Sequence, residues 1–358
     1  MKLTFAEWRL RGGVMNKLLV IGNGFDLAHG KCTRYSDFLG FLEDLFEERL
    51  EENVYDDLKE KRISYKESSL INYLKFYNTN NKIKKNWTDM EIEISNYVRQ
   101  TVDTVMAINN QKQDAERNGK IYTGNPNVFA ENERVILRTA KSVFETDGYS
   151  YFNIKDKFIN PWGVLDIERV MRRFEKELDE LKKLVAYYFR EIEPSRRSNP
   201  IEKKDCFEKL GADKVICFNY TDTYEELYPI DRKDIYYVHG QLKDKNIVLG
   251  YCSDWHDDIG LDLGFEKYLQ RLNNGTDRIG QVLDEITDET VVYFYGHSLH
   301  VSDRDVLLQI IEKASKVNVF YHNEDDRKNK LKSLFLLLGK IVAERRILNE
   351  EIVLSCRK

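Results

Sequence analysis

The sequence has little proline and no pattern of paired cysteines. Its 358 residues include 5 prolines, which favours long regular elements over disordered segments. The 5 cysteines are an odd number, and none has the C-x-x-C spacing. Neither a disulfide framework nor a cysteine zinc site is therefore indicated, and a reduced, cytoplasmic setting is expected.

Long apolar runs and a strong excess of one charge are also missing. No run of about 18 apolar residues occurs, so we expect no transmembrane helix and no membrane partner. The 61 acidic residues slightly exceed the 56 basic ones. The chain therefore has no overall positive field to attract nucleic acid. A hydrophobic content of 42% is enough for a sizeable core.

Short apolar or β-branched runs lie near both ends of the chain. They predict strands buried on both faces of a parallel sheet. Several runs end in Gly, His or Asn, and loops at the carboxyl edge of such a sheet bind ligands. The predicted strands are residues 17–22, 214–219, 235–240, 246–250, 290–296 and 316–322.

The middle of the chain has helical periodicity. Residues 41–53 and 166–193 carry apolar side chains at steps of three and four. We therefore predict an α/β fold, with a Rossmann-like parallel sheet in residues 15–50 plus 206–326. A large, mostly helical insertion would occupy residues 51–205, and residues 327–358 would form a helical C-terminal segment. Apolar faces on the insertion leave a homo-oligomer open.

The first predicted strand ends in a glycine turn. Gly22, Asn23 and Gly24 precede a predicted helix, and glycines in such a turn let the backbone approach a phosphate. The G-x-G-x-x-G pattern is incomplete, because Leu27 occupies the third glycine position. A phosphate-binding turn and a plain tight turn both remain open.

Polar residues follow the second long predicted strand. Asn219 ends the run, and Tyr220, Thr221 and Asp222 come next. A carboxamide suits a ribose hydroxyl or an attacking water, because it donates and accepts hydrogen bonds without charge. The alternative is a turn that caps the following helix.

Two further strand ends carry candidate residues. His239 is placed to act as a general base near neutral pH, unless backbone contacts satisfy its ring. In YGHSLHVSDRD, Gly296 and Ser298 are candidates for ligand contact, whereas Ser302 and Asp305 fit a helix capping box. The histidines of this segment do not have the spacing of a zinc site, and no metal is expected.

The order of these motifs resembles known families. VIGNGFDLAHG, YSDF, NWTDME, FNYTDT, VHG and YGHSL with a later Asp303 resemble the AbiH family of bacteriophage abortive-infection proteins. The resemblance runs from about Lys17 to Asn323. The succession of a glycine loop, an Asn-Tyr turn, His-Gly and Gly-x-Ser also resembles the sirtuin-like family.

The sirtuin-like resemblance implies a Rossmann-type domain that binds NAD as its substrate. It further implies cleavage of the bond between nicotinamide and ribose, which would deplete NAD in an infected cell. Asn219 would hold the ribose or a water, and His239 would be the base. A phage-derived trigger or partner protein remains open. The resemblance assigns Gly22, Gly24 and Phe25 to the dinucleotide, and Gly296, Ser298 and Asn323 to the phosphates or the adenosine ribose.

The sequence departs from the sirtuin-like pattern at three positions. Asn23 replaces alanine, Asp26 replaces serine, and Thr221 stands where many relatives have aspartate, with Asp222 one position later. A carboxylate at Asp26 or Asp222 would favour a ribose cation. These departures leave open a nucleotide-binding module without turnover. A nuclease has only the basic run 196–204 in its favour.

Overall fold

The computed structural model describes residues 16–80, 87–124, 131–146, 152–251, 263–275 and 278–356. They fall into two compact units. Within the described ranges, the α/β unit comprises residues 16–33, 192–248 and 268–356, and the helical unit comprises residues 34–191 and 249–267. The helical unit thus begins at Arg34, earlier than the predicted insertion, and includes residues 249–251 and 263–267 as well.

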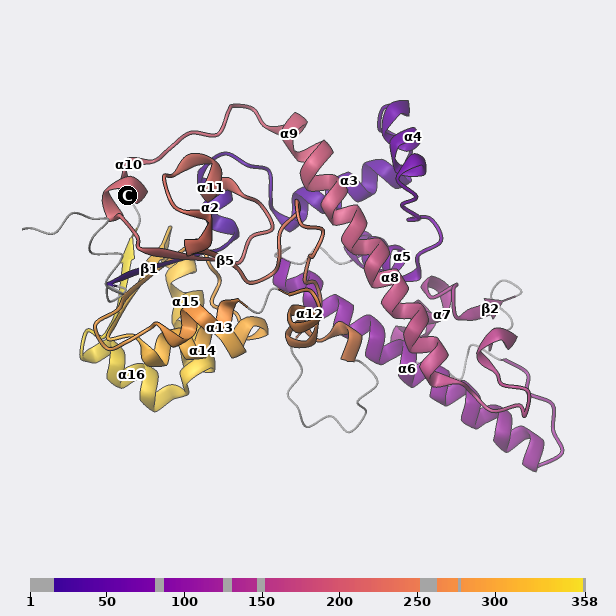
Figure 1. Cartoon of the computed structure of the whole chain (residues 1–358). Helices are drawn as coiled ribbons and strands as arrows, with labels where there is room; N and C mark the ends of the chain where they lie inside the picture. The colour runs from indigo at the N-terminus through magenta and orange to yellow at the C-terminus, as the bar shows by residue number, and fades with distance from the viewer. Residues whose placement is uncertain are drawn as a thin grey trace, which may run out of the picture. The chain divides into compact units, whose positions relative to one another are not determined.

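The α/β unit contains six strands with helices between them (Figure 1). Two short 3₁₀ turns, η4 (Arg232–Asp234) and η6 (Val301–Asp303), belong to it as well. In chain order the other elements are β1 (Lys17–Ile21), α2 (Asn23–Ala28), α9 (Glu193–Arg196), α10 (Asp205–Leu210), β4 (Lys214–Cys217), α11 (Thr223–Leu227), β5 (Ile235–Tyr237), α13 (Ile279–Asp284), β6 (Val291–Tyr295), α14 (Arg304–Lys313), β7 (Lys316–Tyr321), α15 (Glu324–Leu338), α16 (Lys340–Leu348) and β8 (Ile352–Cys356).

The sheet has the strand order β5-β4-β1-β6-β7-β8, and every neighbouring pair is parallel. The chain starts in the middle at β1, adds β4 and β5 on one side, and then returns to add β6, β7 and β8 on the other. This is the doubly wound order of the Rossmann fold. The predicted α/β, Rossmann-like architecture is confirmed.

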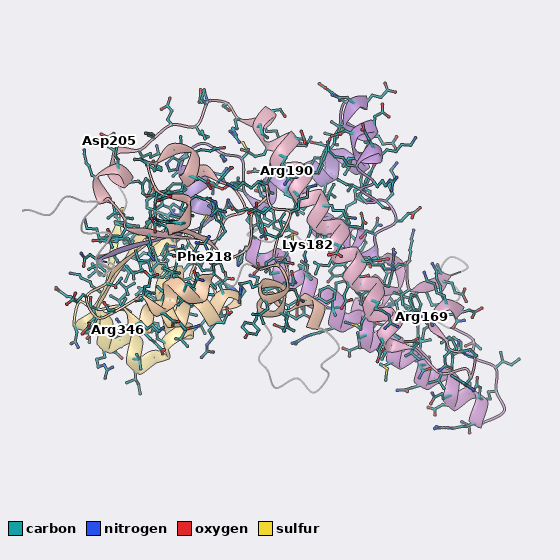
Figure 2. All side chains as sticks on the ribbon, in the orientation of Figure 1. Arg169, Lys182, Arg190, Asp205, Phe218 and Arg346 are labelled. Atoms are coloured by element: carbon teal, nitrogen blue, oxygen red, sulfur yellow. The ribbon has the colours of Figure 1, made fainter. Side chains whose placement is uncertain are left out.

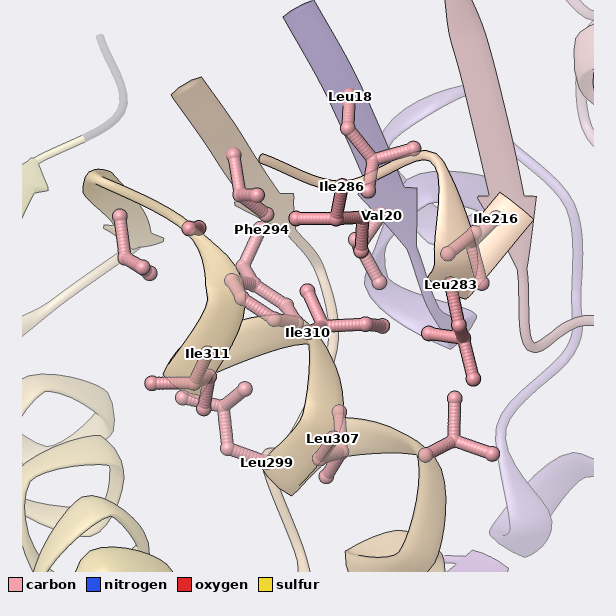
Figure 3. Close-up of a cluster of buried hydrophobic side chains, with 14 of the residues drawn as sticks. Leu18, Val20, Ile216, Leu283, Ile286, Phe294, Leu299, Leu307, Ile310 and Ile311 are labelled. Carbon is pink, nitrogen blue, oxygen red and sulfur yellow. The ribbon is translucent and has the colours of Figure 1, made fainter. Parts of the chain in front are cut away.

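Successive residues of β1 face opposite layers. Leu18 and Val20 pack with Ile216 and Phe294 against α13, α14 and α15 (Figure 3). On the other face, aromatic side chains from α2, α10 and α11 cover the sheet; they are Phe25, Phe207, Tyr224 and Tyr228. Because both faces are covered, β1 reads as a continuous apolar run, as expected for a central parallel strand.

Two predictions for this unit were wrong. Residues 246–250 form no strand: Val248 donates one backbone hydrogen bond to the His239 carbonyl, at 2.9 Å, and the sheet edge is β5. The C-terminal segment is not wholly helical, because β8 follows α16 and pairs with β7. Edge strand β8 is five residues long, and its apolar signal is too short to compete with the helical pattern before it.

The helical unit is built around two long helices. Its elements are α3 (Tyr35–Phe46), α4 (Glu52–Glu60), α5 (Ser69–Asn80), α6 (Trp87–Arg117), α7 (Glu131–Thr139), β2 (Phe144–Thr146), β3 (Phe152–Ile154), η2 (Asp156–Phe158), α8 (Ile167–Tyr187) and η5 (Leu263–Phe265). A π-helical turn, η3 (Tyr188–Ile192), extends α8, and α12 (Lys267–Asn273) begins where this unit ends.

The predicted helix over 166–193 corresponds to α8 and the turn that extends it. Asp166 caps α8 by accepting a hydrogen bond from the Arg169 amide at 2.9 Å. Arg169 and Lys182 lie on α8, and Arg190 lies on the π-helical turn (Figure 2). The predicted helix over 41–53 is broken, because Glu48 has a φ of +56° and separates α3 from α4.

Candidate active site

The candidate residues lie on loops at one edge of the α/β unit. Gly22, Asn219, His239 and Gly296 come directly after, or within two residues of, the carboxyl ends of β1, β4, β5 and β6. The strands that follow β1 in the chain are added first on one side of it and then, from β6 on, on the other side. Ligands of such folds bind in the crevice at this switch point, between β1 and β6. The topology thus brings four predicted loops to one edge.

The glycine turn after β1 packs against the loop after β6. The Gly24 amide donates to the Gly296 carbonyl at 2.8 Å, and the Phe25 amide donates to the Gly22 carbonyl at 2.8 Å. A Cβ on Gly24 would lie 2.7 Å from the Gly296 Cα. Gly296 itself has a φ of +67°. The glycines therefore permit a close backbone contact, and the two amides already have acceptors in this structure.

Asn219 is fixed to the same turn. Its Nδ2 donates to the Gly22 carbonyl at 3.1 Å, and the side chain is buried. The half-buried Tyr220 donates its hydroxyl hydrogen to the Val248 carbonyl at 3.1 Å, and its ring centroid lies 6.2 Å from that of His239. Asp222 is the N-cap residue of α11, and its side chain makes no capping bond there. The carboxamide is thus held in one orientation at the edge.

His239 pairs with an aspartate that follows β6. Its Nε2 lies 2.8 Å from Oδ1 of Asp303, and both side chains are buried. The ring of Phe218, labelled in Figure 2, packs edge-on against His239 with centroids 5.4 Å apart. A neutral histidine that donates from Nε2 keeps its lone pair on Nδ1. The pair therefore has the arrangement of a general base and its orienting carboxylate.

No local motif predicted a role for Asp303. The capping box predicted for its neighbours Ser302 and Asp305 was wrong. Ser302 lies within η6, where its amide donates to Nδ1 of His300 at 3.2 Å. Asp305 instead pairs with Arg271. Since a histidine caps this turn, the Asp303 carboxylate is left to face His239. The resemblance that included Asp303 was the one signal that pointed to it.

A second histidine approaches the same carboxylate. Nε2 of His297 lies 3.9 Å from Oδ2 of Asp303. Nδ1 of His297 accepts a hydrogen bond from the Leu299 amide at 3.0 Å. Asp303 therefore lies between the imidazoles of His239 and His297.

A protein-family match includes all of the loops at this edge. The family model described as bacteriophage abortive infection AbiH matches residues 18–322, from β1 to the residue after β7. The chain belongs to the AbiH family. Membership in AbiH suggests a role in abortive infection by bacteriophage. No curated protein matches the chain.

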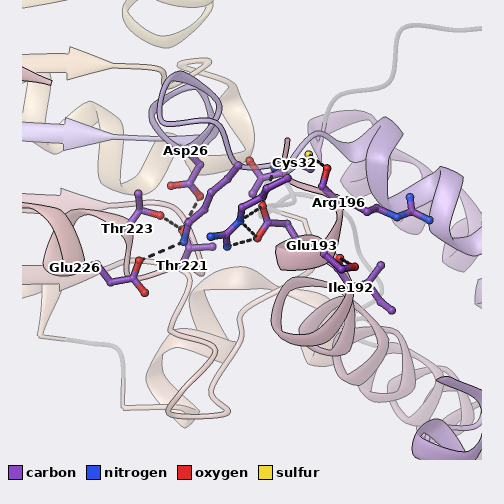
Figure 4. Close-up of polar contacts among 12 residues, drawn as sticks. Asp26, Cys32, Ile192, Glu193, Arg196, Thr221, Thr223 and Glu226 are labelled. Atoms are coloured by element: carbon purple, nitrogen blue, oxygen red, sulfur yellow. Dashed lines mark hydrogen bonds and ion pairs between the residues drawn. The ribbon is translucent and has the colours of Figure 1, made fainter. Parts of the chain in front are cut away.

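Asp26, which lies within the AbiH match, is buried rather than open to a ligand. It is 1% exposed, and its Oδ2 accepts a hydrogen bond from the Thr221 hydroxyl (Figure 4). Its Oδ1 has no hydrogen-bond partner among the described residues. Burial raises the pKa of the Asp26 carboxyl above the ordinary 3.8, and the nearby Lys31 ammonium offsets only part of this effect.

The four other residues that were predicted to contact a ligand lie in different surroundings. Phe25 is fully buried in the aromatic layer over the sheet, with its ring centroid 4.9 Å from that of Phe207. Asn23 accepts a hydrogen bond from the Thr33 hydroxyl at 2.6 Å. Ser298 is exposed. Asn323 caps α15 by accepting from the Asp326 amide at 2.9 Å. The side chains of Phe25 and Asn323 thus have structural partners in this AbiH chain.

Within the described ranges, no three His, Cys, Asp or Glu side chains are grouped so as to hold a metal ion. None of the helices in those ranges is both long and apolar enough to cross a bilayer.

Proposed function

We propose that this AbiH chain hydrolyses the bond between nicotinamide and ribose in NAD, and that abortive infection follows from the loss of NAD. The observation that carries the proposal is the contact between His239 and Asp303 at the carboxyl edge of a Rossmann sheet, the edge that also carries Asn219. General bases held by a carboxylate, next to a fixed polar group, suit the activation of a water molecule.

The chemistry requires one water and one base. When the glycosidic bond breaks, its electron pair goes to the pyridinium nitrogen. Neutral nicotinamide departs, and a ribose cation remains. Asn219 would hold the attacking water or the ribose, and Nδ1 of His239 would take the water proton. The products are nicotinamide, ADP-ribose and a proton. The Asp303 carboxylate would stabilise the imidazolium that forms on His239.

Asp222 completes this proposal as the carboxylate near the ribose. It is half-buried and makes no capping bond to α11. A negative charge there would stabilise the ribose cation that forms as nicotinamide leaves. Asp26 is less suited to direct contact, because its carboxylate is 1% exposed.

Binding without turnover is the second candidate, and one observation favours it. The amides of Gly24 and Phe25 donate to carbonyls of the chain. A dinucleotide would therefore need other donors for its pyrophosphate than those of a standard Rossmann turn. A nucleotide sensor at the same edge would bind NAD and release no nicotinamide.

The test is nicotinamide release, measured by chromatography and mass spectrometry. The full chain would be incubated with NAD, in purified form and in lysates from phage-infected cells. We expect wild type to release nicotinamide and ADP-ribose, and His239→Gln to lose activity by about 10²-fold or more. His322→Gln is the control, because His322 forms an exposed contact of 2.8 Å with Asp326. NAD binding with no release by wild type in either setting would instead support the sensor.

A further inference from the structure

Two imidazoles flank the Asp303 carboxylate at unequal distances from its oxygens. His239 lies 2.8 Å from Oδ1, and His297 lies 3.9 Å from Oδ2. The second distance exceeds a hydrogen bond, but contacts in empty active sites often shorten when a substrate binds. The role of His297 therefore depends on which of its nitrogens carries the proton.

The backbone determines that proton position. The Leu299 amide donates to Nδ1 of His297 at 3.0 Å, so Nδ1 must present a lone pair. A neutral ring then carries its hydrogen on Nε2, the nitrogen that faces Asp303. Leu299 has a φ of +59°, which a leucine seldom adopts. Such backbone strain is concentrated at functional sites.

Three other parts of the α/β unit hold the His297 ring and backbone in place. The buried Lys330 of α15 donates to the His297 carbonyl at 2.6 Å. Phe218 packs against the ring with centroids 4.2 Å apart. Gly22 has no Cβ, and one built there would lie 2.8 Å from the His297 Cα. His297 is therefore constrained at its backbone from α15 and the end of β1, and at its ring from the end of β4.

We propose that His297 is a positioning residue, which presents its Nε2–H to the second oxygen of Asp303 and so holds that carboxylate against His239. The imidazole of His239 is then aligned by a carboxylate that is itself held from its far side. This inference rests on the proposed role of His239 as the base. The proton positions on His239 and His297 can be measured without any NAD turnover.

The experiment is nitrogen-15 NMR of the full chain labelled at histidine, with peaks assigned through single substitutions. In wild type we expect His297 to carry its proton on Nε2. We expect His297→Leu to displace the Hε2 resonance of His239, because Asp303 loses a competing donor. We expect His297→Gln to restore the resonance, because its amide nitrogen replaces Nε2. His322→Gln should leave the resonance unchanged.

The outcomes separate the two proposals. A proton on Nδ1 of His297, or an unmoved His239 resonance in His297→Leu, would overturn the positioning role. Failure of His297→Gln to restore the resonance would overturn it as well. If His297→Leu does not fold, the wild-type proton position decides alone. Absence of nicotinamide release, with the expected NMR signatures, would refute NAD hydrolysis and leave the positioning role standing.

Discussion

Asp26 and Thr221 are 195 positions apart in the sequence, yet the Thr221 hydroxyl donates a hydrogen bond to the Asp26 carboxylate. The Thr223 hydroxyl donates in turn to Thr221 at 3.1 Å. This buried contact connects the turn after β1 to the turn after β4, as does the bond from Asn219 to Gly22. Two of the loops at the candidate site are thus held together, in part by the buried side chains of Asp26 and Thr221.

The Asp26 carboxyl should lower the stability of the fold at neutral pH. Burial raises its pKa above the ordinary 3.8, so the folded chain binds the proton more tightly than the unfolded chain. Stability from this group is therefore greatest below that ordinary value, and it falls as the pH rises toward the folded pKa. We expect Asp26→Asn to raise the free energy of unfolding by about 1 kcal/mol at pH 7.

Urea denaturation at a series of pH values from about 4 upward would measure this effect. The difference between Asp26→Asn and wild type should grow as the pH rises. A difference that is constant over this range, or a variant less stable than wild type at pH 7, would contradict the assignment.

Thr221→Val should act in the opposite direction. It removes the hydroxyl that donates to Oδ2 of Asp26, a carboxylate whose Oδ1 has no hydrogen-bond partner among the described residues. We expect a loss of about 1–3 kcal/mol in the free energy of unfolding. The loss should be smaller when Asp26→Asn is already present, since the two side chains are in contact. Equal losses in both backgrounds would show that the hydroxyl acts independently of Asp26.

Gly24→Ala should separate the turns after β1 and β6. The added Cβ would lie 2.7 Å from the Gly296 Cα, which is backbone and cannot rotate away. We expect a loss of about 1–3 kcal/mol. Gly280→Ala is the matched control, because Gly280 lies in α13, where the new Cβ would meet no heavy atom of the described residues within 4 Å outside its chain neighbours and its own helix backbone. The control should be neutral or gain up to about 1 kcal/mol. Similar melting temperatures for the two variants would be inconsistent with the close contact.

Asp303→Asn should reduce NAD hydrolysis without abolishing NAD binding. An amide cannot stabilise the imidazolium on His239 as a carboxylate does, and it can favour the wrong tautomer of the ring. We expect kcat to fall by about 10²–10⁴-fold and KM to change little. Initial rates over a range of NAD concentrations give both values. An unchanged kcat would remove Asp303 from the mechanism.

The fold could largely be read from the sequence, because buried parallel strands leave apolar runs that local inspection finds. The order of those strands is not local information, since it follows from packing between segments far apart in the chain. The edge strand β8 was missed because five residues beside a long helical pattern give a weak signal. The break between α3 and α4 depends on the positive φ of Glu48, and glutamate rarely indicates such a turn.

The location of the candidate residues could be predicted in part. Asn219 and His239 lie at strand ends, where topology makes polar residues conspicuous. Asp303 matched no local rule of catalysis, and its partner is 64 positions away. Asp26 looked like a ligand contact because it follows the glycine turn. The structure shows it facing inward, an orientation that depends on the path of the chain after β4.

Most of the helical unit lies between β1 and β4, so the central strand of the sheet is made long before its neighbours. β1 ends at Ile21, β4 begins at Lys214 and β6 begins at Val291. At ~5–20 residues per second, synthesis of the chain between β1 and β4 takes roughly 10–40 s. During that time β1 has neither of its partners. The edge that carries Asn219, His239 and Asp303 therefore assembles late in synthesis, and a truncated chain that ends before β6 cannot complete it.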